Sequence, residues 1–459
     1  MAVVRRGRIL GTMTDRREFV ASLLAAGVAL PAPLRRPARS AALPSATQLA
    51  WQDLEVGMFI HFAPNTWQDR EYDNHTTSLE AMNPDIDTDQ WAAVARDLGA
   101  RYIVFVAKHQ GGFCMWQTET SRYGILATPW KRGRGDVLAD LAASCRRANL
   151  GLGVYLSPRD DTLGAAAGGR CGTLEQQRQY DTVYRQQLTE VLTRYGEMTE
   201  VWFDGSIVVP VGDILAAHAR RAAIFQGPQA TIRWVGNENG FAPSPAWNAV
   251  RRTAAATGVS TAKDGDPDGG VWLPIEVDVS LRRPNWFWNS HQGRSVLSLP
   301  SLLEIYYRSV GHGTQLLLNI PPDTSGHIAA VDAARAKEFG DEVRRRFGRS
   351  AGETRGQGDE VVLRLAAPAD VDHVVMEEDL RGGERIREYR LEGYANGRWG
   401  LLGAGTSIGH KRIQPVPQGR LSAVRLLATR ASASPRIRRL AAFATGSAPP
   451  PTWNERDTN

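Results

Sequence analysis

Short apolar runs alternate with longer amphipathic segments over the first two thirds of the chain. The apolar runs, rich in β-branched and aromatic residues, lie at residues 57–62, 102–107, 152–156, 200–203, 231–235 and 315–320. Segments of helical period separate them, most clearly at residues 88–98, 136–149 and 174–194. This alternation is typical of βα units on a parallel sheet. Six or more such units in about 300 residues predict a closed (β/α)8-like barrel of the TIM type.

The pattern changes after Arg345, where alternating strand-like segments replace the helical period. Candidate strands lie at residues 361–365, 371–376, 386–391, 399–402 and 424–427, with turn residues between them. Several short strands without helices are typical of a small antiparallel β-sandwich. The sequence therefore predicts a catalytic barrel over residues 46–348, a C-terminal β-sandwich over 355–446 and a flexible, Pro-rich tail over 447–459.

The first 45 residues have the pattern of an export signal. Arg16-Arg17-Glu18-Phe19 precedes an apolar run from Val20 to Leu30, which is too short to span a bilayer comfortably. The arginine pair resembles a twin-arginine signal, a class that exports folded proteins. We expect residues 1–45 to be removed, with cleavage near Ser40 to Ala42, and the mature protein to be periplasmic or secreted and free of the membrane. The alternative is a basic tail.

Composition argues against several other classes of function. The net charge of +6 comes from scattered arginines without a basic block interleaved with aromatic residues, so nucleic acid is not an expected partner. Three cysteines without a CxxC pair and nine histidines without an HExxH motif suggest neither a disulfide framework nor a metal site. No GxGxxG or P-loop follows a predicted strand, so no nucleotide cofactor is expected. Thirteen tryptophans supply aromatic faces that suit sugar rings or fill a large core.

Polar residues end the predicted barrel strands, which is where the functional residues of a parallel barrel gather. They are His61, Lys108, His109, Ser157, Asp204, Asn237, Glu238, Glu276, Asp278 and Asn319. Acids beside histidines and tryptophans, without a metal-binding set, are the equipment of a glycosidase. Such an enzyme needs one carboxylate under the anomeric carbon and one protonated acid at the leaving oxygen.

Asp204 is the candidate nucleophile, because an apolar strand delivers it to a turn at Gly205. The alternative is that Asp204 caps the next helix. The candidate general acid is Glu238 or Glu276, with a pKa raised by aromatic, partly dry surroundings. Either of these two could instead be a salt-bridged structural acid.

Three motifs resemble those of glycoside hydrolase family twenty-nine, the α-L-fucosidases. They are residues 57–62 (GMFIHF), 107–114 (AKHQGGFC, similar to a KHHDGF segment) and 200–206 (EVWFDGS). The resemblance implies a retaining exo-α-L-fucosidase that releases terminal L-fucose from fucosylated oligosaccharides or glycoconjugates, without a cofactor. It implies that Asp204 is the nucleophile. The implied substrate-binding residues are His61, Glu71, Tyr72, His109, Trp202, Glu276, Asp278 and Trp286.

A second set of motifs resembles the branch of that family that prefers α-1,3/1,4-linked fucose on Lewis-type glycans. It comprises residues 155–158 (YLSP), 233–238 (RWVGNE), 274–280 (PIEVDVS), 316–322 (LLLNIPP) and 405–413 (GTSIGHKRI). In that branch the acid/base is the Glu of the Gly-Asn-Glu motif, which maps to Glu238. Glu276 is then the alternative acid/base or a substrate contact.

Some positions depart from the family pattern. His109-Gln110-Gly111 stands where the family has His-His-Asp, so one ring-binding imidazole and a nearby carboxylate are missing. Tyr72 stands where a Trp follows the Glu, and residues 157–162 lack a usual Trp and Arg-Asn. A glycosidase for a related sugar such as α-L-galactose and a non-catalytic carbohydrate-binding relative are therefore the alternatives. The sandwich is expected to brace the barrel, and residues 405–413 to reach toward its catalytic face.

Overall fold

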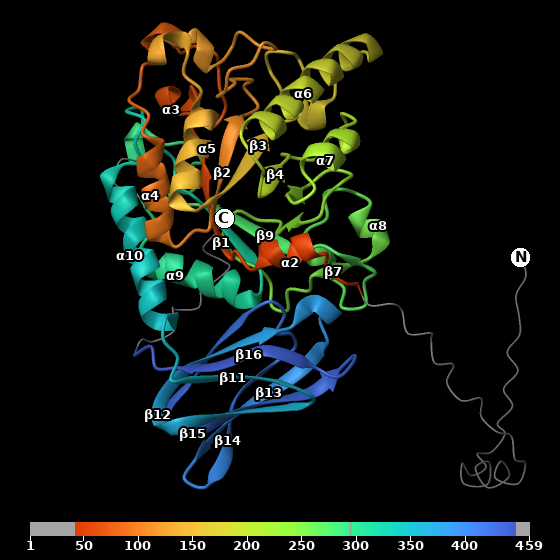
Figure 1. The fold of residues 1–459 in the computed structure, drawn as a ribbon, viewed down its shortest axis with the longest axis vertical. Helices are drawn as coiled ribbons and strands as arrows, with labels where there is room; N and C mark the ends of the chain where they lie inside the picture. The colour runs from red at the N-terminus through yellow and green to blue at the C-terminus, as the bar shows by residue number, and fades with distance from the viewer. Residues whose placement is uncertain (1–41, 293–295, 447–459) are drawn as a thin grey trace, which may run out of the picture. The chain divides into compact units, whose positions relative to one another are not determined.

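A parallel barrel is the larger part of the fold in the computed structural model, which describes residues 42–292 and 296–446 (Figure 1). Its strands are β1 (Val56–Ile60), β2 (Tyr102–Lys108), β3 (Gly151–Leu156), β4 (Glu200–Trp202), β5 (Ala223–Phe225), β6 (Arg233–Trp234), β9 (Ile275–Ser280) and β10 (Gln315–Asn319). Their order in the sheet is β5-β4-β3-β2-β1-β10-β9-β6. A parallel bridge between Phe225 and Ile232 joins the two outer strands. The barrel is nearly closed, and the predicted fold class is confirmed.

Helices follow most of the strands and cover the outside of the barrel (Figure 1). They are α4 (Thr88–Leu98), α5 (Val137–Ala148), α6 (Leu174–Arg194), α7 (Gly212–His218), α9 (Leu299–Arg308) and α10 (Ala330–Phe347). Asp87, Asp136 and Thr173 cap the first three of these, each accepting a backbone N–H from the first turn. These caps explain why the helices predicted near residues 88, 136 and 174 begin where they do.

Shorter elements complete this part of the chain. They are α2 (Ala46–Gln52), α3 (Asn65–Gln68), α8 (Arg252–Ala255) and a two-stranded sheet of β7 (Ala249–Val250) and β8 (Val271–Trp272). Trp51 of α2 belongs to the same apolar cluster as the residues inside the barrel.

The strands are apolar on both faces, because one face lines the barrel and the other packs against helices. On β2, Tyr102 and Val104 belong to the inner cluster, whereas Ile103 and Phe105 belong to the cluster shared with the helices. Successive side chains of a strand point to opposite faces. The polar residues at the strand ends that lie an even number of positions from these inner residues therefore also point into the barrel.

The C-terminal part is a six-stranded antiparallel sheet in the order β11-β16-β12-β15-β13-β14. The strands are β11 (Gly352–Gln357), β12 (Glu360–Glu378), β13 (Ile386–Ala395), β14 (Arg398–Gly405), β15 (Arg412–Ala431) and β16 (Arg436–Phe443). The register between β12 and β15 shifts after Arg364 and again after Val371. Residues before and after these shifts, such as Leu363 and Met376, share one apolar cluster. The sheet thus folds into two layers. The strands predicted separately at residues 361–365 and 371–376 are the two halves of one long strand, β12.

The sandwich contacts the end of the barrel at which the strands begin. His410 Nε2 and Arg438 Nη1 lie 2.8 and 2.6 Å from Asp53 Oδ1, and Lys411 pairs with Glu55, just before β1. The expectation that residues 405–413 reach toward the catalytic face is therefore wrong. Their charged side chains are used in bracing the barrel at its opposite end.

The predicted signal peptide lies almost entirely outside the described residues, and the predicted tail at 447–459 lies wholly outside them. The described chain begins with Ala42, which packs against Ala249 and Trp272, and Ser45 caps α2. None of the helices within residues 42–292 and 296–446 is long and apolar enough to cross a membrane.

A buried ion pair fixes the segment after β9 to helix α10, and it gives the first prediction. Arg282 and Asp332 form a two-point contact of 2.7 and 2.8 Å, with both side chains fully buried. Replacing Asp332 with Ala leaves a buried guanidinium without its counter-ion, so we expect a loss of about 3–5 kcal/mol in the free energy of unfolding. The measurement is thermal or urea unfolding. Asp341→Ala removes exposed pairs with Lys337 and Arg344 and should lower the free energy of unfolding much less, because water screens exposed pairs. Equal losses in the two variants would contradict the prediction.

Candidate active site

A cavity of about 360 Å³ opens at the carboxyl ends of the barrel strands. It is lined by Phe59, His61, Glu71, Tyr72, His109, Gln110, Tyr155, Trp202, Asp204, Glu238, Asp278, Pro284 and Trp286. The structure thus brings together every site residue expected from the sequence except Glu276. Residues from distant parts of the chain meet here because the βα units place the ends of their strands at one face.

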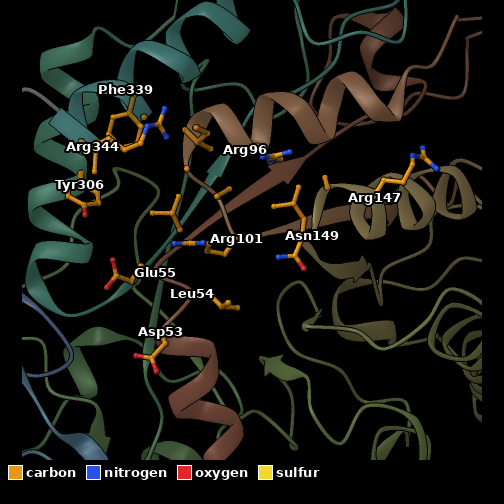
Figure 2. Close-up of a pocket in the computed structure, with 18 residues that line it drawn as sticks. Asp53, Leu54, Glu55, Arg96, Arg101, Arg147, Asn149, Tyr306, Phe339 and Arg344 are labelled. Carbon is orange, nitrogen blue, oxygen red and sulfur yellow. The ribbon is translucent and has the colours of Figure 1, made fainter. Parts of the chain in front are cut away.

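A larger cavity of about 660 Å³ lies at the opposite end, where β1 and β2 begin. Figure 2 shows its arginines, including Arg96, Arg101 and Arg147, spread around the cavity rather than directed at one point. Arg147 is also paired with Asp89, at 2.5 Å. Binding sites carry a few convergent polar groups, so the smaller cavity is the better candidate.

Asp204 lies two residues beyond β4 and faces the smaller cavity. The Tyr155 hydroxyl donates a hydrogen bond to Asp204 Oδ2 at 3.0 Å. Burial raises the pKa of Asp204 above its usual value, while the Tyr155 hydroxyl and the charge of Arg159 oppose that rise. Helix α7 begins only at Gly212, with Val211 in the capping position. Asp204 is therefore not a helix cap.

Glu238 reaches the cavity from the loop that follows β6. It is exposed, in contrast to the other acids of the site. Its negative charge adds to burial in raising the pKa of Glu71 to about 7. It likewise adds to the raised pKa of Asp278, which burial and the charge of Glu276 raise well above the usual range. Glu71 and Asp278, whose pKa values are raised, thus lie near the exposed Glu238.

Two histidines face the cavity with imidazoles that stay uncharged. His61 Nδ1 lies 2.8 Å from Asn319 Oδ1, and burial lowers the pKa of His61 to about 3. Burial also lowers the pKa of His109 well below its usual value. The Nδ1 atom of His109 is buried and has no hydrogen-bond partner within the part of the chain that the structure describes. Buried polar atoms without a partner are uncommon in folded proteins.

Glu276 is the second residue of β9 and lies beneath the cavity. It is fully buried, and Trp202 Nε1 donates to its Oε1 at 2.8 Å. Burial raises the pKa of Glu276 well above its usual value, and the neighbouring Glu200 raises it further. Two buried carboxyls near each other favour the neutral form of Glu276. Glu276 therefore supports Trp202, which forms part of the cavity wall.

Sequence reasoning did not propose Phe59, Tyr155 or Pro284 as site residues. The alternation along the strands could have identified two of them. Phe59 lies two residues before His61 on β1, and Tyr155 is the register partner of Trp202 on the neighbouring strand. Both therefore point into the barrel. Pro284 lies in a loop, where no periodic signal exists.

Comparisons with known proteins identify the family. A family model described as alpha-L-fucosidase matches residues 67–346. The chain belongs to this family. It is therefore a glycoside hydrolase and an α-L-fucosidase, and the family recognised from the sequence motifs is confirmed.

Relatives of this fucosidase match over most of their length. The chain is 34% identical over 421 residues to alpha-L-fucosidase 1 of Arabidopsis thaliana, covering 81% of each protein. It is similar to a crystal structure of a putative alpha-L-fucosidase from Bacteroides thetaiotaomicron, with 30% identity, a TM-score of 0.81 and coverage of 88% of this chain and 99% of that one. A glycoside hydrolase 29 family member from an unknown rumen bacterium gives 30% identity, a TM-score of 0.79 and coverage of 89% and 78%.

The buried position of Glu276 gives the second prediction. Glutamine has the shape of the protonated acid and still accepts from Trp202 Nε1, so Glu276→Gln should keep kcat/KM of this fucosidase within roughly tenfold of the parent. Glu276→Ala leaves the buried indole N–H unpaired and should lower the free energy of unfolding by about 1–3 kcal/mol. Aryl α-L-fucoside kinetics and thermal unfolding provide the measurements. A folded but inactive Glu276→Gln protein would show that this carboxyl takes part in the chemistry.

Proposed function

We propose that the protein is a retaining exo-α-L-fucosidase that acts by double displacement. The observation that carries this proposal is that Asp204 and Glu238, from different strands, line one small cavity. Asp204 is the buried acid and Glu238 the exposed one. Two carboxyls in different surroundings can take different roles in one pocket, although the dry surroundings expected for the general acid are not those of the exposed Glu238.

In the first step, an oxygen of Asp204 attacks the anomeric carbon of fucose. Tyr155 occupies Oδ2 with its hydroxyl, which leaves Oδ1 to form the new bond. The bond from the anomeric carbon to the glycosidic oxygen breaks, and Glu238 gives its proton to that oxygen as the aglycone leaves.

In the second step, Glu238 is a carboxylate and takes a proton from water. The water oxygen attacks the anomeric carbon from the face that the aglycone left, and the bond to Asp204 breaks. Two inversions at one carbon give net retention, so the product is α-L-fucose. Asp204 returns to the carboxylate and Glu238 to the acid.

The other lining residues hold the sugar in this proposal. His61, His109 and Glu71 bond the ring hydroxyls, and Trp202 packs against the face that carries the C5 methyl group. Trp202 suits this role because it is stacked on Phe225, with ring centroids 3.9 Å apart and planes at 7°. Tyr72, Asp278 and Trp286 supply further contacts at the wall and mouth of the cavity.

We further propose that the preferred substrates carry α-1,3/1,4-linked fucose and that the enzyme acts outside the cytoplasm. The motifs at residues 155–158, 233–238 and 274–280 support the linkage preference. Arg16-Arg17 and the apolar run from Val20 to Leu30 support export through a twin-arginine-type signal.

The third prediction tests the two acids separately. Asp204→Ala should lose at least about 1000-fold in kcat on an aryl α-L-fucoside, and azide should partly restore turnover by forming the β-fucosyl azide. Glu238→Ala should keep activity on substrates with good leaving groups, and azide should there give the α-fucosyl azide. Proton NMR of the products reads the configuration. Unchanged turnover in folded Asp204→Ala would refute the assignment of the nucleophile.

The fourth prediction concerns linkage. The parent enzyme should release fucose from Lewis-type trisaccharides with α-1,3 or α-1,4 linkages at least about tenfold faster than from 2′-fucosyllactose, measured as kcat/KM by fucose release. Aryl α-L-fucoside and aryl α-L-galactoside serve as controls for the sugar itself. Equal rates on all fucosides would contradict the linkage preference but leave the mechanism intact.

A further inference from the structure

We propose that Asp73 is a positioning residue of the sugar pocket, whose carboxylate sits against Gly111 and fixes the loop that carries Glu71 and Tyr72. The inference rests on the proposed function, because it assumes that these two loop residues contact the substrate. It concerns position 111, where this chain has a glycine and the family motif has an aspartate.

Gly111 leaves the space that Asp73 fills. A Cβ atom on residue 111 would lie 2.5 Å from Asp73 Cβ and 2.8 Å from Asp73 Oδ2, closer than such atoms approach. The backbone of Gly111 is not in the left-handed region, so space and not strain makes glycine necessary. An aspartate at position 111 and one at position 73 would thus compete for the same volume.

The Asp73 carboxylate is buried and fully engaged. Tyr123 donates its hydroxyl to Oδ2 at 2.5 Å, while Gln68 Nε2 and the backbone N–H of His75 donate to Oδ1, each at 2.8 Å. Tyr123 belongs to the segment after β2, whereas Gln68 and His75 flank the pocket loop. The carboxylate therefore joins two segments that are separate in the chain.

A second contact holds the same loop in place. His75 Nε2 lies 2.9 Å from the carbonyl oxygen of Gly111. On the other side, Asn65 Nδ2 donates to the carbonyl of Glu71 at 2.9 Å, and the Glu71 carboxylate accepts the backbone N–H of Trp286 at 3.0 Å. Tyr72 is 63% exposed at the cavity mouth, and the structure shows no hydrogen bond from its side chain within residues 42–292 and 296–446. The loop is thus anchored at Glu71 by Asn65 and Trp286, and beyond Tyr72 by the contacts of residues 73 and 75.

Asp73 thus occupies the volume that a side chain at position 111 would need. Asp73 does not line the cavity among the described residues, so it acts through the residues beside it. The contact of Asp73 with Gly111 adds an anchor on the side of the loop that Asn65 and Trp286 do not hold.

The test begins with two mild variants, Tyr123→Phe and Asp73→Asn, assayed on an aryl α-L-fucoside and by titration with L-fucose. Each should raise KM and the Kd for fucose about tenfold while kcat changes less than about threefold, because binding contacts are loosened and the two acids are untouched. A purely structural loss would lower the active fraction, and so kcat, at constant KM. Tyr195→Phe is the matched control, because it removes a similar bond, 2.8 Å long, to Asp136 away from the cavity. Its KM should not change.

The decisive comparison exchanges the two side chains. Gly111→Asp alone should raise KM more than tenfold, and Gly111→Asp combined with Asp73→Gly should recover at least about threefold of that loss, because one carboxylate again meets Tyr123. The inference is overturned if the double variant is no better than Gly111→Asp, or if Tyr123→Phe and Asp73→Asn bind fucose as the parent does. Asp204→Ala is assayed in parallel, since retained activity there would instead remove the proposed function.

Discussion

Polar groups inside the barrel must be paired with one another, and this requirement shapes the whole site. A buried carboxyl without a hydrogen bond costs several kcal/mol, and here each interior acid lies beside an indole that donates to it. The pairs are Trp51 with Glu200, Trp202 with Glu276 and Trp234 with Asp278, at 2.8, 2.8 and 2.6 Å. They run from the closed end of the barrel to the cavity. Trp202, which forms part of the cavity wall, is therefore held by Glu276, an acid that does not itself line the cavity.

The same dry surroundings set the chemistry of Asp204. Burial alone favours the neutral acid, which cannot attack a carbon, whereas the Tyr155 hydroxyl and the charge of Arg159 favour the carboxylate. In the proposed mechanism, a carboxylate that burial keeps poorly solvated interacts strongly with the positive charge that develops at the anomeric carbon. Tyr155 in turn is fixed by stacking on Trp202, with centroids 5.2 Å apart. The pair of Glu276 and Trp202 thus helps to fix the position of Asp204, the proposed nucleophile, through the rings of Trp202 and Tyr155.

Much of the fold and most of the cavity could be predicted from the sequence, because both follow from local patterns. Helices α4 and α6 have the predicted bounds, since a capping residue and an amphipathic period mark them. The three-residue strand β5 was missed, because only its pairing with β4 defines it. Glu276 was taken for a strand-end residue, yet β9 continues to Ser280. The end of a strand is set by its pairing with neighbouring strands. The depth of a residue such as Glu276 inside the barrel therefore cannot be read from the local sequence.

The substitutions at Gln110 and Gly111 show a different limit of motif reading. Along the chain they look like the loss of two substrate-binding groups. In space, Gln110 still lines the cavity and offers an amide in place of an imidazole, while Asp73 fills the volume beside Gly111. A motif compares residues at fixed positions, whereas a pocket requires only that a group of suitable chemistry reach a given place. Because Asp73 comes from another loop, its contact with Gly111 can be recognised only once the two loops are seen together.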